Sequence, residues 1–131
     1  MPVKGLDHVN IIAHDLDATI AFYRDLLGFR AEPNPMAPMG FNGRWLLDGS
    51  DRPTIHLMAW NDERHAGLER GSATGSIDHV ALACEDFAGT IRRCKELGVE
   101  HRVNDLKYGD LRQVFVTDPN NVTLELNFAG E

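Results

Sequence analysis

Four side chains of metal-ligand type occupy two positions that recur along the chain. His8 and His79 stand in the same tripeptide, Asp-His-Val, and His56 and Glu125 stand in matching apolar runs that begin with threonine. Imidazole and carboxylate groups suit Fe, Ni, Co, Zn and Mn, and strands hold such ligands rigidly. Duplication preserves an apolar core easily, but packing gives no reason to keep a coordinating residue at both positions of both copies. The pattern therefore predicts one divalent transition metal ion per site, bound by all four side chains.

Each of these residues taken singly has a simpler explanation. A lone histidine on a strand is usually a hydrogen-bonded structural residue, and hydrogen bonds alone can compensate a buried carboxylate. Glu125 lies between Leu124 and Leu126, so its desolvation requires either a cation or strong hydrogen bonds. The repetition of the pattern is what favours metal binding.

The repeat extends well beyond the four candidate ligands. The segment LDHVNIIAHDLDATIAFYRDLLG from Leu6 aligns with IDHVALACEDFAGTIRRCKELG from Ile77, 71 residues later. A second match aligns the TIHL run at Thr54 with the TLEL run at Thr123, 69 residues later. Each copy passes from an apolar-rich segment to a helical period and then to short strand-like runs, which predicts the order β-α-β-β-β twice.

Capping residues mark the ends of both predicted helices. Asp15 and Asp86 are natural N-caps, and Gly28 and Gly98 are natural C-terminal stops. Apolar stripes run along the helices between these caps. The predicted helices are Leu16–Leu27 and Phe87–Leu97, and the predicted strands are Leu6–Ala13, Phe29–Glu32, Arg44–Leu47, Thr54–Trp60, Ile77–Cys84, Glu100–Val103, Leu111–Thr117 and Val122–Phe128.

Length and composition indicate one globular domain. The chain has 131 residues, of which 43% are hydrophobic and 25% are charged. We expect a single domain over 1–131, with module one at 4–60, a linker at 61–76 and module two at 77–128. A core of this size does not need a structural metal or disulfides, so any bound metal is free to be functional.

Charge and targeting signals limit the partners and the compartment. Thirteen basic and twenty acidic residues give a net charge of −7 without a basic stripe, which disfavours nucleic acid and anionic membranes as partners. The sequence shows neither an apolar run of membrane-spanning length nor a signal peptide, so we expect a cytoplasmic protein. In that compartment Cys84 and Cys94 are expected to remain thiols.

The sequence resembles the vicinal oxygen chelate superfamily, which includes glyoxalase I, methylmalonyl-CoA epimerase, extradiol dioxygenases, fosfomycin-resistance enzymes and bleomycin-binding proteins. The resemblance rests on LDHVNIIAHDLDATIAFYRDLLGF, TIHLMAW, IDHVALACEDF and DPNNVTLELNF. It implies an α+β fold of paired βαβββ modules that form a curved mixed sheet around a metal cleft. By position, His8, His79 and Glu125 match the ligands of the family, and His56 falls where glyoxalase I has Glu and the epimerase has Gln. The resemblance also implies a homodimer, in some members with each site shared between subunits.

The number of protein ligands decides which chemistry follows. Four ligands around an octahedral ion leave two positions for adjacent substrate oxygens, which suits isomerase or lyase chemistry through an enediolate. Glu125 and His56 are the candidate catalytic groups, and Glu125 is placed to serve as both ligand and base. If His56 does not ligate, His8, His79 and Glu125 form a triad suited to Fe(II) and O₂, as in a dioxygenase.

Differences from the residue patterns of individual family members disfavour some of the possible functions. The characteristic tyrosine of extradiol enzymes is replaced here by Phe115, which disfavours ring cleavage. Fosfomycin-type enzymes carry a threonine and a basic residue where this chain has Asn10 and the acidic end Phe128–Glu131. A metal-free small-molecule binding protein of the bleomycin-resistance type is a further alternative, against which the retained ligands argue. We therefore expect a metal-dependent glyoxalase-like enzyme acting on a small oxygen-rich substrate.

Five further residues are candidates for contacts with that substrate. Tyr108 and Arg112 suit an anionic or enolic group, although Arg112 is equally explained as an exposed strand residue. Aromatic and methionine side chains on strands are more often core than pocket, so Trp45 and Met58 carry the same alternative. The three other histidines, at 14, 65 and 101, are expected to be solvated. The candidate substrate contacts are Asn10, Trp45, Met58, Tyr108 and Arg112.

Overall fold

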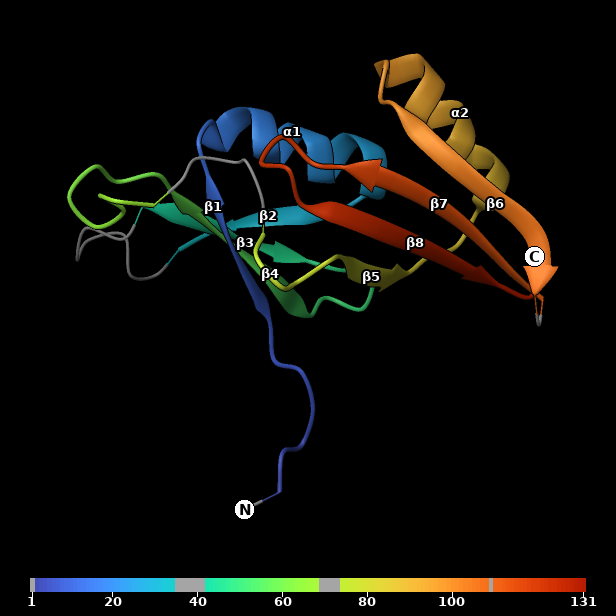
Figure 1. Cartoon of the computed structure of the whole chain (residues 1–131), viewed down its shortest axis with the longest axis horizontal. Helices are drawn as coiled ribbons and strands as arrows, with labels where there is room; N and C mark the ends of the chain where they lie inside the picture. The colour runs from blue at the N-terminus through green and yellow to red at the C-terminus, as the bar shows by residue number, and fades with distance from the viewer. Residues whose placement is uncertain (1, 35–41, 69–73, 109) are drawn as a thin grey trace. The chain divides into compact units, whose positions relative to one another are not determined.

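The computed structural model describes residues 2–34, 42–68, 74–108 and 110–131, with the backbone alone at 106–108. The chain forms two compact units, Met1–Leu68 (unit 1) and Glu69–Glu131 (unit 2). Each unit contains one four-stranded mixed sheet and one helix (Figure 1). The predicted α+β fold with two βαβββ modules is confirmed.

The two sheets have the same topology. In both, the first strand of the module lies at one edge and pairs in parallel with the last strand, and the other pairs are antiparallel. The sheet order is β1-β4-β3-β2 in unit 1 and β5-β8-β7-β6 in unit 2. The elements are β1 Val9–Ala13, α1 Leu16–Leu27, β2 Arg30–Pro33, β3 Gly43–Leu47, β4 Pro53–Ala59, β5 Val80–Ala83, α2 Phe87–Leu97, β6 His101–Tyr108, β7 Leu111–Thr117 and β8 Thr123–Ala129.

The helices begin and end where their capping residues predict. The Asp15 carboxylate accepts a hydrogen bond from Ala18 N, and the Asp86 carboxylate accepts one from Gly89 N. Gly28 ends α1 and its equivalent in the second module ends α2, both in the left-handed conformation. No helix of the described residues is long and apolar enough to cross a membrane.

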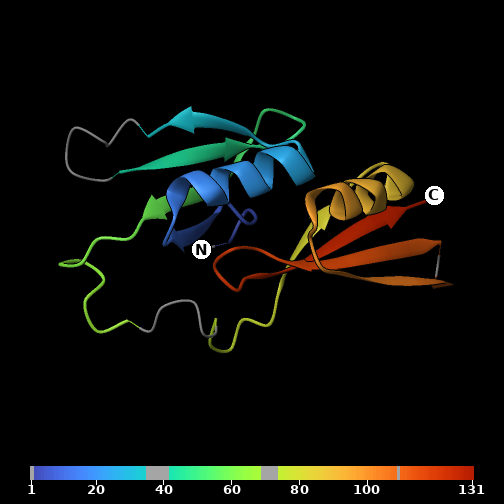
Figure 2. The ribbon, with the colours of Figure 1, turned by 90° about the horizontal axis from the view of Figure 1, so that it is seen from above.

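Each unit has its core between its helix and one face of its sheet. In Figure 2 each helix lies along one side of the sheet of its own unit. Alternate strand residues point toward the helix and are buried, and those between them point the other way. We call this second side the helix-free face. The buried apolar residues include Ile11, Tyr23, Leu26, Ile55 and Leu57 in unit 1, and Val114, Val116, Leu124, Leu126 and Phe128 in unit 2.

The first strand of each module begins three residues later than predicted. We expected strands from Leu6 and Ile77, but β1 starts at Val9 and β5 at Val80. Pairing with the parallel partner strand sets this limit: Val9, opposite Ile55, is the first residue that pairs with β4, and Val80, opposite Leu124, is the first that pairs with β8. β6 is instead longer than predicted, because its hairpin with β7 closes only at the end of the strand.

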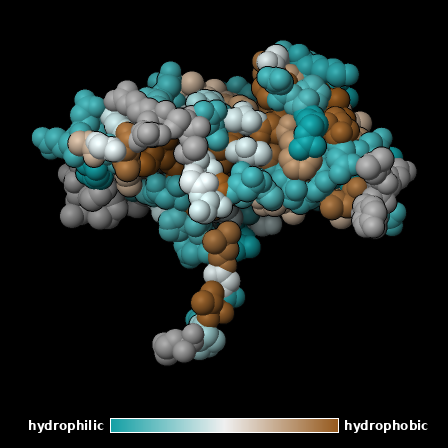
Figure 3. All heavy atoms as spheres, in the orientation of Figure 1, coloured by the Kyte–Doolittle hydropathy of each residue, from teal (hydrophilic) through white to brown (hydrophobic). Residues whose placement is uncertain are grey.

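Apolar side chains are exposed just before β1 and β5, the first strands of the two modules. Leu6 is 79% exposed and Ile77, its equivalent in the repeat, is 64% exposed. The extended segment before β1, at the bottom of Figure 3, carries hydrophobic atoms along its length. An edge strand flanked by exposed apolar groups is a surface that proteins normally cover.

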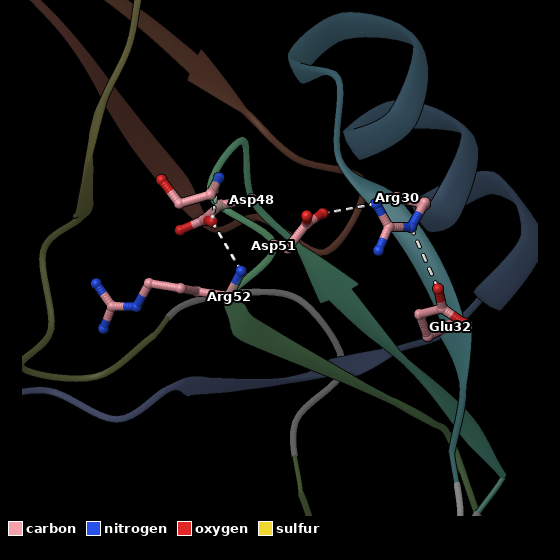
Figure 4. Close-up of polar contacts among 6 residues, drawn as sticks. Arg30, Glu32, Asp48, Asp51 and Arg52 are labelled. Carbon is pink, nitrogen blue, oxygen red and sulfur yellow. Dashed lines mark hydrogen bonds and ion pairs between the residues drawn. The ribbon is translucent and has the colours of Figure 1, made fainter.

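The turn between β3 and β4 is held by a carboxylate. Asp48 accepts hydrogen bonds from backbone N–H groups of the turn, including that of Arg52 at 3.0 Å, and these bonds lower the pKa of Asp48 (Figure 4). Arg30 on β2 adds ion pairs with Asp51, at 2.7 Å, and with Glu32, at 3.2 Å. This turn sets the register of the hairpin that carries Trp45 and His56.

Both cysteines are free thiols, as expected. Cys94 is buried on α2, and Cys84 follows β5. Burial raises the pKa of the Cys84 thiol to about 11, so this group stays protonated near neutral pH.

Substitution of Gly43 is expected to destabilise unit 1. A Cβ atom at this position would collide with the carbonyl oxygen of Leu57, a backbone atom on the paired strand. Gly43→Ala must therefore push β3 away from β4, and we expect urea denaturation to show a loss of about 1–3 kcal/mol. Gly49→Ala is the matched control, because no heavy atom lies within 4 Å of its Cβ position. Equal stability of the two variants would contradict the close approach of these strands.

Candidate functional site

Trp45 contacts both candidate ligands of unit 1. The indole ring stacks on the His56 imidazole, which lies opposite it across the β3–β4 pair, with ring centroids 4.4 Å apart and planes at 10°. His8 meets the same indole edge-on, with centroids 4.8 Å apart. The two imidazole centroids are 6.3 Å apart. The structure therefore brings His8, His56 and Trp45 together on the helix-free face of unit 1.

The His56 ring is oriented from its other side by Asn10. The Asn10 amide lies 3.0 Å from Nδ1 of His56, and the two residues are partners in the parallel β1–β4 register. Turning the amide exchanges its donor for its acceptor, so Asn10 can serve either tautomer of the imidazole. Nε2 of His56 is buried and has no hydrogen-bond partner among the described residues. This atom is therefore available to donate a proton or to offer a lone pair.

Burial keeps the His56 ring neutral. Desolvation lowers the pKa of His56, and the nearby charge of protonated His8 lowers it further. Neutral imidazole is the form that binds metal ions. The environment of His56 thus fits a ligand, a general base or a neutral hydrogen-bond donor near pH 7.

Each of the other two histidines is held by the aspartate that precedes it. Nδ1 of His8 lies 2.5 Å from Asp7, and Nδ1 of His79 lies 2.8 Å from Asp78. Proteins often orient metal-binding histidines through such a carboxylate, which leaves Nε2 for the ion. We predicted no role for these aspartates, although the repeated Asp-His-Val tripeptide was the signal that could have revealed them.

His79 and Glu125 form the corresponding pair in unit 2. Nε2 of His79 lies 3.8 Å from Oε2 of Glu125, whose side chain is 18% exposed. The hydrogen bond to Asp78 raises the pKa of His79, and the charge of Glu125 adds to this effect. The Glu125 carboxylate also accepts a hydrogen bond from Asn127, at 3.1 Å. An imidazole and a largely buried carboxylate therefore face each other on the helix-free face of unit 2.

Each unit holds two of the four predicted ligands. Within the described part of the chain, no group of three or more His, Cys, Asp or Glu residues is placed to hold a metal ion. The observed groupings are a His–His pair packed on an indole and a His–Glu pair. Both pairs combine donor types that bind divalent transition metals.

The predicted substrate contacts divide between the two faces of the sheets. Asn10, Trp45 and Met58 share the helix-free face with His56, and the Met58 side chain is half-buried. Tyr108 is the last residue of β6, and its side chain lies outside the described residues.

Arg112 lies on the other side of its sheet from Glu125. Its guanidinium packs over the Phe87 ring of α2, 5.2 Å from the ring centre, and its Nε is 2.9 Å from Asp105. The reason is the alternation of side chains along β7. Arg112 projects from the same face as the core residues Val114 and Val116, whereas Phe115, the cross-strand partner of Glu125, projects from the other face. The structure therefore does not bring Arg112 to the candidate site.

His65 is buried, contrary to the expectation of a solvated residue. Its Nδ1 accepts a hydrogen bond from Asn61 N, and its ring lies 5.1 Å from that of Trp60. The imidazole closes a local turn after β4, which the spacing of charged and polar residues in this stretch did not indicate.

A family profile settles the membership of the chain. The Glyoxalase/Bleomycin resistance protein/Dioxygenase superfamily matches residues 5–126. The chain belongs to this superfamily. The resemblance predicted from the sequence motifs is therefore confirmed.

Two relatives within the superfamily are named as enzymes. A lactoylglutathione lyase from Haemophilus influenzae is 29% identical over 129 residues, which cover 90% of this chain and 87% of the relative. A metallothiol transferase FosB from Staphylococcus epidermidis is 28% identical over 138 residues, which cover 97% of this chain and 83% of the relative. These identities support the superfamily and leave the reaction to be proposed.

Solved structures of the superfamily share the fold. A fosfomycin resistance protein FosX from Listeria monocytogenes matches with a TM-score of 0.72 and 21% identity, covering 98% of this chain and 95% of that one. The same protein complexed with Mn(II) and sulfate matches with a TM-score of 0.67 and 21% identity, covering 99% and 95% of the two chains. At this identity the likeness shows the fold alone.

The two histidines with opposite pKa shifts should titrate apart. In the metal-free protein, we expect the pKa of His79 to lie above the ordinary value of 6.5 and that of His56 below it, as followed by NMR of the imidazole rings. Asp78→Asn should lower the pKa of His79, because it removes the largest cause of the increase. Glu96→Gln, which changes an exposed carboxylate of α2, is the control and should leave His79 unaffected. Identical titration of His56 and His79 would show that their described surroundings are wrong.

Proposed function

We propose that this chain is a metal-dependent glyoxalase-like enzyme, an isomerase or lyase that acts on a small oxygen-rich substrate. The observation that supports this most is the pairing of Glu125 with His79. Their facing atoms are 3.8 Å apart, which is too long for a hydrogen bond, and the carboxylate is largely buried. Two ligand atoms bound to one ion at about 2.1 Å and at right angles are roughly 3 Å apart, so a modest approach would fit a shared cation.

The ring nitrogens of the three histidines also fit binding of this metal ion. His8 and His79 keep Nε2 uncommitted because their Nδ1 atoms are held by aspartates, and Nε2 of His56 is buried without a partner. Under the proposal, His8, His56, His79 and Glu125 hold one divalent ion, which is Fe, Ni, Mn, Co or Zn. When bound, this ion supplies Lewis acidity toward adjacent oxygens of the substrate.

Proton transfer falls to the chain's own residues. Glu125 accepts the Asn127 hydrogen bond at Oε2, and its Oε1 accepts none from the described residues, so Oε1 is the proposed base. His56, kept neutral by burial, is the second group able to take a proton, at Nε2. Because Glu125 is proposed to be both a metal ligand and the base, its loss is proposed to remove both metal binding and turnover.

Substrate contacts are proposed on the helix-free faces. Asn10 orients the substrate or His56, and the apolar surfaces of Trp45 and Met58 exclude water beside the two imidazoles. Tyr108 remains a proposed contact from its position in the sequence. Arg112 is left out because its guanidinium lies on the helix side of the sheet.

One observation favours a second candidate function. The Asn10 amide contacts Nδ1 of His56 and the Trp45 indole packs on its ring, contacts that also suit a His56 that supports the site and does not ligate. In that case His8, His79 and Glu125 are the proposed ligands, a set suited to Fe(II)-dependent oxygen chemistry. His56→Ala separates the two candidates, because only the four-ligand site loses metal affinity in this variant.

Metal content tests the proposal directly. We expect elemental mass spectrometry to find about one equivalent of metal per chain after anaerobic reconstitution with Fe(II), Ni(II), Mn(II) or Zn(II). Glu125→Ala should lower metal affinity at least about tenfold, since it removes a charged ligand. Glu96→Ala, an exposed glutamate on α2, is the matched control and should bind like the wild type. Protein that binds none of these ions would instead point to the metal-free binding protein.

The chain is also proposed to form a homodimer. Each unit carries half of the candidate ligands, and each presents an edge strand preceded by an exposed apolar residue, Leu6 or Ile77. Pairing of such edges with a second copy would cover these apolar groups.

The mass in solution checks this assembly. Light scattering should give twice the 14.6 kDa of one chain. Leu6→Lys and Ile77→Lys should each shift the protein toward the monomer, because a charge at an apolar contact is costly to desolvate. Leu97→Lys changes an exposed leucine of α2 and serves as the control. A wild-type monomer would contradict the proposed assembly.

A further inference from the structure

A continuous row of side-chain amides crosses the helix-free face of unit 2 and ends at Glu125. Asn104 on β6 donates a hydrogen bond from Nδ2 to Oε1 of Gln113 on β7, at 2.9 Å. Gln113 donates from Nε2 to Oδ1 of Asn127 on β8, at 3.0 Å. Asn127 donates from Nδ2 to Oε2 of Glu125, at 3.1 Å. We call these three residues, Asn104, Gln113 and Asn127, the amide row.

The sheet register builds the amide row into the fold. Asn104 is the cross-strand partner of Gln113, and Gln113 is the partner of Asn127. Asn127 and Glu125 are two residues apart on β8, so both project from the same face. Each hydrogen bond therefore joins side chains that the backbone already places side by side.

The carboxylate fixes the direction of every bond in the row. An ionised carboxylate only accepts hydrogen bonds, so Asn127 must turn its NH₂ group toward Glu125 and its oxygen toward Gln113. Gln113 must then present its own NH₂ group to Asn127, and Asn104 must do the same to Gln113. Three amide dipoles consequently point the same way, and each strengthens the next.

The other module shows that the fold itself does not require the amide row. Trp45 and His56 occupy the register positions of Phe115 and Glu125. The Gln113–Asn127 pair lies two residues from the Phe115–Glu125 pair along β7 and β8. The pair at the same distance from Trp45 and His56 along β3 and β4 is Gly43 and Met58. No amide row is possible there, although the strand order is the same. The row is present in the module whose candidate ligand is a carboxylate.

We propose that Asn104, Gln113 and Asn127 are positioning residues for Glu125. Asn127 holds Oε2, the oxygen that faces His79. Gln113 and Asn104 hold Asn127, and Oε1 is left to accept a substrate proton. Hydrogen bonds to a ligating carboxylate typically change metal affinity 10–100-fold. This inference rests on the proposed function, but its central claim, that the row is organised by the charge of Glu125, can be measured in the metal-free protein.

The first experiment measures Mn(II) affinity by titration calorimetry. Asn127→Leu removes the donor to Glu125 and should weaken binding about tenfold, and Gln113→Leu should weaken it less, about threefold, because it acts through Asn127. Thr117→Val is the matched control, since it removes a polar group from the same face of β7 outside the row, and it should bind like the wild type. Wild-type affinity in both leucine variants would overturn the proposal and leave the proposed function intact.

The second experiment follows the side-chain amide signals of the metal-free protein by NMR. Glu125→Gln removes the group that sets the direction of the row, so the NH₂ signals of all three row residues should shift, including that of Asn104 two strands away. Glu96→Gln changes an exposed carboxylate of α2 and should leave them in place. A shift confined to Asn127 would overturn the proposal, because the row would then act only as local sheet contacts. If the wild type binds neither Mn(II) nor any other of the proposed ions, the proposed function fails and the NMR result alone decides on the row.

Discussion

The alternation of side chains along a β-strand is the constraint on which both halves of the candidate site depend. Each helix covers one face of its sheet, and every second strand residue joins that core. Polar side chains that must stay outside the apolar core can project only from the other face. His56, Glu125 and the amide row all do so, whereas Arg112 has the opposite parity and is held against α2.

The two modules support their candidate ligands by different means. His56 is oriented from the β1 side by Asn10 and packed from the β3 side by Trp45. Glu125 faces Ala81 on the β5 side, which has no polar side chain, and its hydrogen bond comes instead from Asn127 on its own strand. Duplication thus kept the backbone and the ligand positions, and the supporting contacts diverged with the chemistry of the ligand.

Much of the fold and part of the site could be predicted from the sequence. Periodicity and capping residues defined both helices to the residue, because Asp15, Asp86, Gly28 and Gly98 act locally. The starts of β1 and β5 could not be predicted in this way, since they depend on where pairing with the parallel partner strand begins. The roles of Asp7 and Asp78 are local contacts with the next residue, and the repeated Asp-His-Val tripeptide was their signal in the sequence. The amide row instead depends on the geometry of side chains on three strands, which neither spacing nor composition contains. Burial of His65 depends in the same way on a turn that only the folded chain closes.

The single amide beside His56 has a consequence for how this position can evolve. Because the Asn10 amide can turn, it would offer a donor to a carboxylate, or either of its ends to a side-chain amide, with no other change in the surroundings. Position 56 can therefore exchange one ligand type for another in a single step. Position 125 lacks this freedom, because replacing its carboxylate would require three amides on three strands to reorganise together. Divergence of reaction type from this scaffold is consequently easier through the first module than through the second.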